Sequence, residues 1–177
     1  SPGAPRPLAV LQALTNHVGA TALQDRRLHQ VFGPTPPDCG VEDGVQFFRA
    51  VLLGHVAYVD APLVRYRVGG LSAGAEPWAD GAAPSEERRM VFASWVLANL
   101  HAYLADLEKV PDLPERERCR ALCRRQIALR DLEVAMWRAG PMRRPVVLVR
   151  ALRRSWLSGN PSHARQAFAG LFRRAGA

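Results

Sequence analysis

Several kinds of residue are scarce in this 177-residue chain, and each shortage excludes some classes of fold or of binding site. Lys109 is the only lysine, so arginine supplies almost all of the basic charge. Cysteine occurs three times, at Cys39, Cys119 and Cys123, which predicts free thiols rather than a disulfide framework or a zinc site. No uninterrupted apolar run reaches about eighteen residues. The most apolar stretch, residues 91–107, contains polar side chains and is predicted to be a core helix.

Acidic residues are absent from the last part of the chain. Residues 141–177 hold eight arginines and no aspartate or glutamate, whereas the other 140 residues hold 16 basic and 16 acidic residues. The net charge of +8 therefore belongs to this C-terminal tail. The high isoelectric point is a local property of one surface.

Two amphipathic helices are predicted in the basic tail, over 145–157 and 162–174, with Trp or Phe on their apolar faces. Such helices suit an anionic membrane surface, so we expect a cytoplasmic protein lying peripherally on the inner face of the plasma membrane through 141–177. Packing of the apolar faces on the protein's own core is the alternative. We expect no nucleic-acid binding, because the aromatic residues lie on the apolar faces and no known binding motif accompanies them.

Hydrophobic periodicity predicts a mainly helical chain that contains two short strands. Residues 8–14 fit either a short helix or a strand. The expected helices cover 25–32, 42–53, 85–109, 115–139, 145–157 and 162–174, and the expected strands cover 55–59 and 63–67. Residues 69–84 are rich in Gly, Ala and Pro, which predicts a boundary between a first part, 1–75, and a second part, 76–177.

An ordered series of short motifs lies between residues 14 and 73. Its members are Gly19-Ala20-Thr21, Arg26-Arg27-Leu28, Val31-Phe32-Gly33-Pro34, Glu42-Asp43, Leu53-Gly54 with Tyr58, and Pro62-Leu63-Val64-Arg65-Tyr66-Arg67. The series resembles the second half of the catalytic domain of family-two glycosyltransferases of the GT-A type. Each motif alone is weakly specific, and the order and close spacing carry the resemblance.

The resemblance implies an α/β fold that is predominantly α, namely a partial GT-A catalytic domain over 1–75 followed by a helical extension over 76–177. It implies a nucleotide-sugar donor and a saccharide or lipid-linked acceptor. Family members hold Mg²⁺ or Mn²⁺ through an Asp-x-Asp motif in their first half, and this sequence contains no Asp-x-Asp. We therefore expect the metal ligands to lie outside this chain. The chain is expected to be the C-terminal part of a longer transferase and to be inactive alone.

The resemblance also implies roles for the acidic pair at the start of the 42–53 helix. Inverting sugar transfer needs a base that takes the proton from the acceptor hydroxyl. Asp43 corresponds to that base in the family, and Glu42 would orient the loop or the acceptor. The alternative is that both carboxylates only favour the positive end of a helix.

Five further residues are expected to bind substrate. Arg65 and Arg67 share one face of the second predicted strand, with Tyr66 between them, and arginine suits the donor phosphates through paired hydrogen bonds. Gly19 would let the backbone approach a ligand closely, and His17 lies beside it. Many family members carry a metal-binding histidine just after Tyr-Arg, but here the residues are Val68 and Gly69. Solvated arginines and a structural histidine are the alternatives.

A second function is open from the sequence. The basic helices could belong to a non-enzymatic module that binds nucleic acid or another acidic partner. The motif series from Gly19 to Arg67 favours the glycosyltransferase over the binding module, because a binding module does not explain why these motifs occur in this order.

Overall fold

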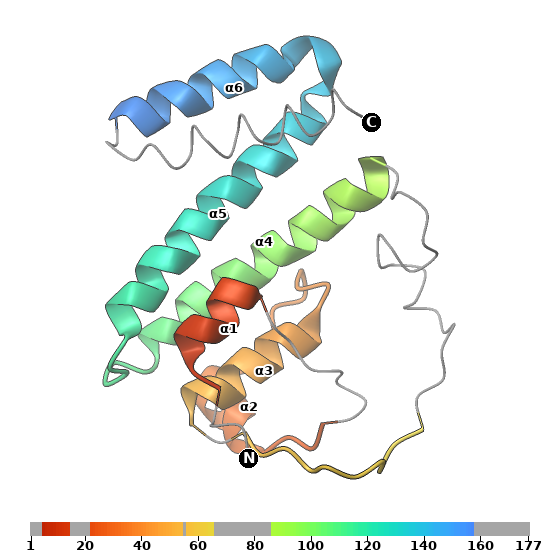
Figure 1. Cartoon of the computed structure of the whole chain (residues 1–177), viewed down its shortest axis with the longest axis vertical. Coiled ribbons are helices and arrows are strands. Elements are labelled where there is room, and N and C mark those ends of the chain that lie inside the picture. The colour runs from red at the N-terminus through yellow and green to blue at the C-terminus, as the bar shows by residue number, and fades with distance from the viewer. Residues whose placement is uncertain (1–4, 15–21, 55, 66–85, 158–177) are drawn as a thin grey trace.

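The computed structural model describes residues 5–14, 22–54, 56–65 and 86–157, and all regular structure in these ranges is helical. The helices are α1 (Pro7–Ala13), α2 (Arg27–Phe32), α3 (Glu42–Leu52), α4 (Glu86–Glu108), α5 (Arg116–Arg138) and α6 (Gly140–Leu157). Helices α4 and α5 form an antiparallel hairpin, and α6 turns back to pack on α5 (Figure 1). Helices α1, α2 and α3 gather at the hairpin's closed end, where α3 contacts α4 and α1 contacts α5.

Helix α3 carries the apolar stripe that the sequence predicted. Val45, Phe48, Val51 and Leu52 recur at helical spacing, and all four are buried. The ring of Phe48 lies against Tyr103 of α4, with a centroid separation of 4.5 Å. This stripe joins α3 to one continuous core that runs from Val10 in α1 to Ile127 in α5.

Helix α5 buries a face that differs in part from the predicted one. The buried residues are Cys119, Cys123, Ile127 and Val134, spaced by about one or two turns along one side. Of the predicted inward residues Leu122, Ile127, Leu129, Leu132 and Met136, only Ile127 is buried, and the other four are half-buried. The helix has neighbours on more than one side, α4 and α1 along its length and α6 near its end, so its apolar side chains share partial burial.

The three cysteines are buried free thiols. Burial raises the pKa of Cys39 to about 11 and the pKa of Cys123 to about 12, and it also raises the pKa of Cys119. A thiol with so high a pKa carries almost no thiolate at neutral pH and packs as a small apolar side chain.

The predicted α/β fold is wrong for the described residues, which contain no strand. Residues 56–60 and 61–65 are extended but pair with nothing that would form a ladder, and the backbone bond recorded within them is local, from Leu63 N to Ala61 O. Tyr58 is 80% exposed and Leu63 is 73% exposed. A strand requires a neighbour for its backbone groups, and short runs rich in Val, Leu and Tyr favour an extended conformation without supplying that neighbour. The segment leaves the C-terminal end of α3 and runs along the edge of the molecule (Figure 1).

Helix α6 starts at Gly140, five residues before the predicted start at Pro145. Pro141 lies in the first turn, where a backbone N–H has no partner inside the helix and its loss costs nothing. Pro145 lies inside the helix and removes one intrahelical hydrogen bond, yet the helix continues through it. The predicted helix over 162–174 and the predicted boundary within 69–84 lie outside the described residues.

Helix α4 is long and apolar enough, over Glu87–Glu108, to pass a length-and-composition criterion for a membrane span. In this fold α3 and α5 pack against it, and it carries Asn99 and Asp106, both buried and both bonded to other parts of the chain. Its place is therefore that of the central core helix.

Candidate functional site

The acidic pair forms the first turn of α3, as the sequence predicted. Glu42 is exposed, and Asp43 is half-buried beside it. Negative side chains are favourable there because the unpaired N–H groups give this end of a helix a positive partial charge. The residue before the helix, Val41, makes no side-chain cap, so other contacts must hold the turn.

Two contacts with α4 hold the turn that leads into α3. The Asn99 side chain donates a hydrogen bond from Nδ2 to the Val41 carbonyl oxygen over 2.7 Å. Gly40 lies flat against the indole of Trp95, and a Cβ at this position would overlap the ring. The entry to α3 is thus fixed to the central helix by one partly buried hydrogen bond and one close apolar contact.

The close contact at Gly40 yields a test of how firmly this turn is held. We expect Gly40→Ala to lower the free energy of unfolding by about 1–3 kcal/mol, because the backbone or Trp95 must shift to admit a methyl group. Urea unfolding followed by circular dichroism measures the change. The double variant with Trp95→Leu should regain part of the loss, since the smaller side chain frees the space. Unchanged or raised stability in Gly40→Ala would contradict the packing.

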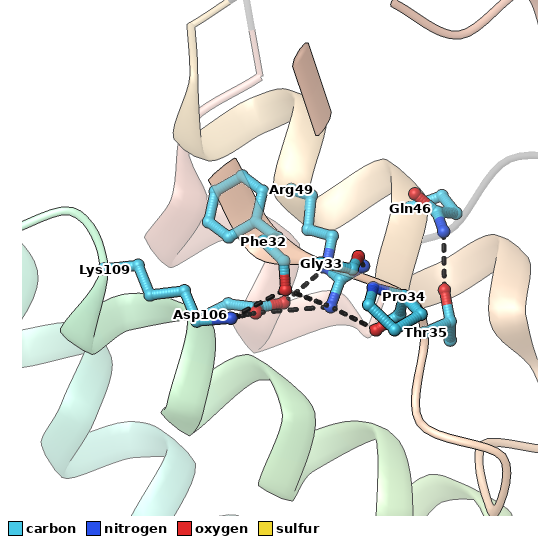
Figure 2. A network of polar contacts seen from close by, with 8 residues as sticks. All are labelled: Phe32, Gly33, Pro34, Thr35, Gln46, Arg49, Asp106 and Lys109. Atoms are coloured by element: carbon cyan, nitrogen blue, oxygen red, sulfur yellow. Dashed lines mark hydrogen bonds and ion pairs between the residues drawn. The ribbon is translucent and has the colours of Figure 1, made fainter. Parts of the chain in front are cut away.

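A buried ion pair fixes the body of α3 to α4. The Nε of Arg49 donates to Oδ2 of Asp106 over 2.7 Å, and both side chains are only 2% exposed. The other guanidinium nitrogens donate to the loop after α2, with Nη1 lying 3.0 Å from the Gly33 carbonyl oxygen. Figure 2 shows Arg49 between Asp106 and the carbonyl groups of this loop, so one side chain joins α2, α3 and α4.

Asp106 is the one carboxylate in this network, and it faces the cations Arg49 and Lys109. Burial raises the pKa of Asp106, and hydrogen bonds from Arg49 oppose that rise. Lys109 is partly exposed, donates to the Phe32 carbonyl oxygen over 2.6 Å and lies 3.8 Å from Asp106 (Figure 2). The guanidinium carbon of Arg49 also lies 5.5 Å from the centroid of the Phe32 ring.

A further side-chain bond ties the loop before α3 to the helix. The Nε2 of Gln46 donates to Oγ1 of Thr35 over 2.5 Å, on the side of α3 away from Lys109 (Figure 2). Together with the Gly40 and Val41 contacts, it holds the chain on both sides of the acidic turn. Glu42 and Asp43 therefore lie on a rigid support that still reaches the surface.

The predicted site residues that the structure describes lie on two different elements, α3 and the extended segment that follows it. Among them, Glu42 and Asp43 lie together in one helical turn. Arg65 is exposed on the extended segment that follows the opposite, C-terminal end of α3. The predicted residues His17, Gly19, Tyr66 and Arg67 lie outside the described residues.

The residues that hold α3 on α4, above all Arg49 and Asp106, were not predicted from the sequence. Positions 45, 48, 49 and 52 have the spacing of a helix core face, and an arginine fills one of them. A charged residue at a core position requires a buried partner. That signal could have identified Arg49, but the identity of its partner depends on how α3 packs on α4.

Within the described ranges, no group of three or more His, Cys, Asp or Glu side chains is placed to hold a metal ion. Comparisons of the chain with models of protein families, with curated proteins and with solved structures find no match. Its function must therefore be inferred from its own residues.

Proposed function

We propose that this chain contributes the acceptor side of a nucleotide-sugar-dependent glycosyltransferase, with Asp43 as the general base. The observation that carries the proposal is the position of Asp43, which is half-buried in the first turn of α3. Hydrogen bonds hold the chain just before this turn, at Val41, and just after it, at Gln46. The ordered motif series around it supports the same function. Most contacts to the donor nucleotide, and the ligands of a Mg²⁺ or Mn²⁺ ion, are proposed to come from residues outside this sequence.

The base must take one proton at one defined place. As the acceptor hydroxyl oxygen attacks the anomeric carbon of the donor, Asp43 takes the hydroxyl proton, the bond from that carbon to the phosphate oxygen breaks, and the nucleoside diphosphate leaves. A carboxylate acts in this way only if it stays within hydrogen-bond reach of the hydroxyl. The contacts of Asn99 and Trp95 with the turn before α3 restrict the movement of that turn. They therefore favour a single position of the Asp43 carboxylate, in which it can accept the proton.

Glu42 and Arg65 have supporting roles in this proposal. Glu42 is the more exposed of the two carboxylates, which suits contact with a polar acceptor. Arg65 is exposed on the extended segment after α3, where its guanidinium is accessible to a phosphate of the donor. The acceptor class, a saccharide or a lipid-linked saccharide, is proposed from the resemblance alone.

The test is made on the full-length protein that contains this sequence, with release of nucleoside diphosphate from a panel of nucleotide sugars as the assay. We expect Asp43→Asn to lower kcat roughly a hundredfold or more, the range that general-base catalysis supplies. The KM for the donor should change little, because the base contacts the acceptor.

Glu42→Gln is the matched control, since it removes the neighbouring carboxylate from the same helical turn. It should lower kcat much less than Asp43→Asn, whereas a role of both residues as helix-start charges predicts similar, small effects of about 1 kcal/mol or less on stability and little on kcat. Near-full kcat in Asp43→Asn would remove Asp43 as the base.

A further inference from the structure

Helix α6 presents an apolar stripe to solvent on the side away from α5. Met142, Val146 and Val149 lie at i, i+4 and i+7, and they are 95%, 51% and 63% exposed. The half-buried residues Val147 and Leu148 lie on the opposite side of the helix, which accounts for the packing on α5. One face of α6 thus packs on α5, and the apolar stripe on the other face stays exposed to solvent.

Three exposed arginines border this stripe. Arg153 continues it at i+11, and Arg143 and Arg150 each lie one residue after one of its apolar members. The sequence of α6 contains no aspartate or glutamate, so nothing on the helix neutralises these charges. Apolar side chains and uncompensated positive charge therefore share one outward face.

The junction with α5 holds this face in a fixed orientation. Arg144 donates from Nε to the Met136 carbonyl oxygen over 3.3 Å, and its guanidinium carbon lies 5.4 Å from the centroid of the Trp137 ring. Because Arg144 bonds to α5, it belongs to the fold and not to the outward face. Among the described residues, no ion pair or side-chain hydrogen bond involves the three bordering arginines, so their charges are available to a partner.

We propose that the outward face of α6 binds the surface of an anionic lipid bilayer, with Met142, Val146 and Val149 inserted among the headgroups and the arginines on lipid phosphates. A bilayer surface accepts apolar side chains and positive charge from the same face of one helix. Arginine can extend its charged end to the phosphates while its carbon chain stays in the apolar layer. This inference does not depend on the proposed transferase activity.

Nucleic acid and a second copy of this chain fit the face less well. A phosphate backbone would pair with the arginines but would leave the apolar stripe in water. In a symmetric dimer through α6, the apolar stripes would meet but the arginines of the two copies would repel each other, since the helix contains no acid.

The experiment is cosedimentation of the full chain with vesicles of equal parts phosphatidylglycerol and phosphatidylcholine, and with vesicles of phosphatidylcholine alone. We expect binding to the anionic vesicles only, weakening steeply as salt is raised. Replacing Arg143, Arg150 and Arg153 together by glutamine should lower the partition coefficient on the order of a hundredfold, or roughly fivefold for each arginine. Glutamine keeps good helix propensity, so α6 should persist, and circular dichroism checks this.

Two further variants separate a specific face from general charge. The matched control replaces Arg26, Arg118 and Arg124, exposed arginines at the start of α2 and in the first half of α5, with glutamine for the same loss of charge. It should lose at least tenfold less affinity than the α6 arginine variant. Replacing Met142, Val146 and Val149 by glutamine should weaken binding to anionic vesicles while the salt dependence persists.

The following results would overturn the proposal. They are equal binding to neutral and anionic vesicles, no binding to anionic vesicles at low salt, equal losses in the α6 and control arginine variants, or binding to mixed-sequence DNA without binding to vesicles. A stable dimer in sedimentation velocity that dissociates when the three apolar residues are replaced would also overturn it, in favour of a second copy.

Discussion

Asp106→Leu is expected to lower the free energy of unfolding by about 3–5 kcal/mol, because it leaves the buried charge of Arg49 without its carboxylate. Both side chains are only 2% exposed, so water cannot replace the lost partner. The carbonyl groups at Gly33 and Phe32 would still accept from the guanidinium, but they carry no full negative charge. Since whole domains are stable by roughly 5–15 kcal/mol, a loss of this size removes a large share of the total stability.

Urea unfolding of the chain, followed by circular dichroism, measures this effect. Arg49→Met should cost a similar amount, because it leaves Asp106 as the unpaired buried charge. The double variant Arg49→Met with Asp106→Leu should be more stable than either single variant, since neither buried charge remains. That nonadditivity distinguishes a buried ion pair from two independent side chains.

Lys109→Met is the control within the same network. Lys109 is 44% exposed and lies 3.8 Å from Asp106, so its contribution is screened by solvent. We expect its replacement to change the free energy of unfolding by less than about 1 kcal/mol. If Asp106→Leu cost no more than Lys109→Met, Arg49 and Asp106 would not be a buried pair in solution.

Phe48→Ala is expected to have the other large effect, a loss of about 3–5 kcal/mol of stability. Phe48 is fully buried on α3, and its ring lies against Tyr103 of α4. Removing the ring takes away apolar burial and leaves a cavity where α3 meets the central helix. The same urea experiment reports this loss as a shift of the unfolding midpoint.

The size of the Phe48 effect is checked by a conservative change and by a surface change. Phe48→Leu keeps most of the volume and should cost less than half as much as the alanine variant. Val31→Ala, at a position 43% exposed on α2, should cost less than about 1 kcal/mol. Equal effects of Phe48→Ala and Val31→Ala would mean that α3 does not pack on α4 as described.

Local features of the sequence were enough to predict most helices. Acidic residues at the start and the stripe of Val45, Phe48, Val51 and Leu52 predicted α3 to within one residue at its end. The ends of α4 and α5 were likewise predicted to within one residue where they can be compared. Helical hydrogen bonds form within the segment itself, so a helix can be predicted from its own residues.

The extended segment after α3 shows where such prediction fails. Residues 55–59 and 63–67 were predicted as strands from their Val, Leu and Tyr content, yet the parts of them that the structure describes have no neighbour among the described residues. Strand pairing depends on residues far away in the sequence, and no property of the segment alone supplies them. The sheet was thus predicted from residues that favour an extended backbone, although such residues do not ensure that a neighbouring strand is present.

The amino-acid sequence by itself determined the helical segments, the location of the positive charge in the last 37 residues, and the acidic pair at the start of α3. Only the tertiary structure decided that Arg49 meets Asp106, 57 residues away, and that Gly40 and Val41 are held by Trp95 and Asn99. It also decided which face of α6 packs on α5 and which faces solvent. The division follows from range, because propensity and helix-end charge act within a few residues, whereas burial and pairing depend on which distant segments come into contact.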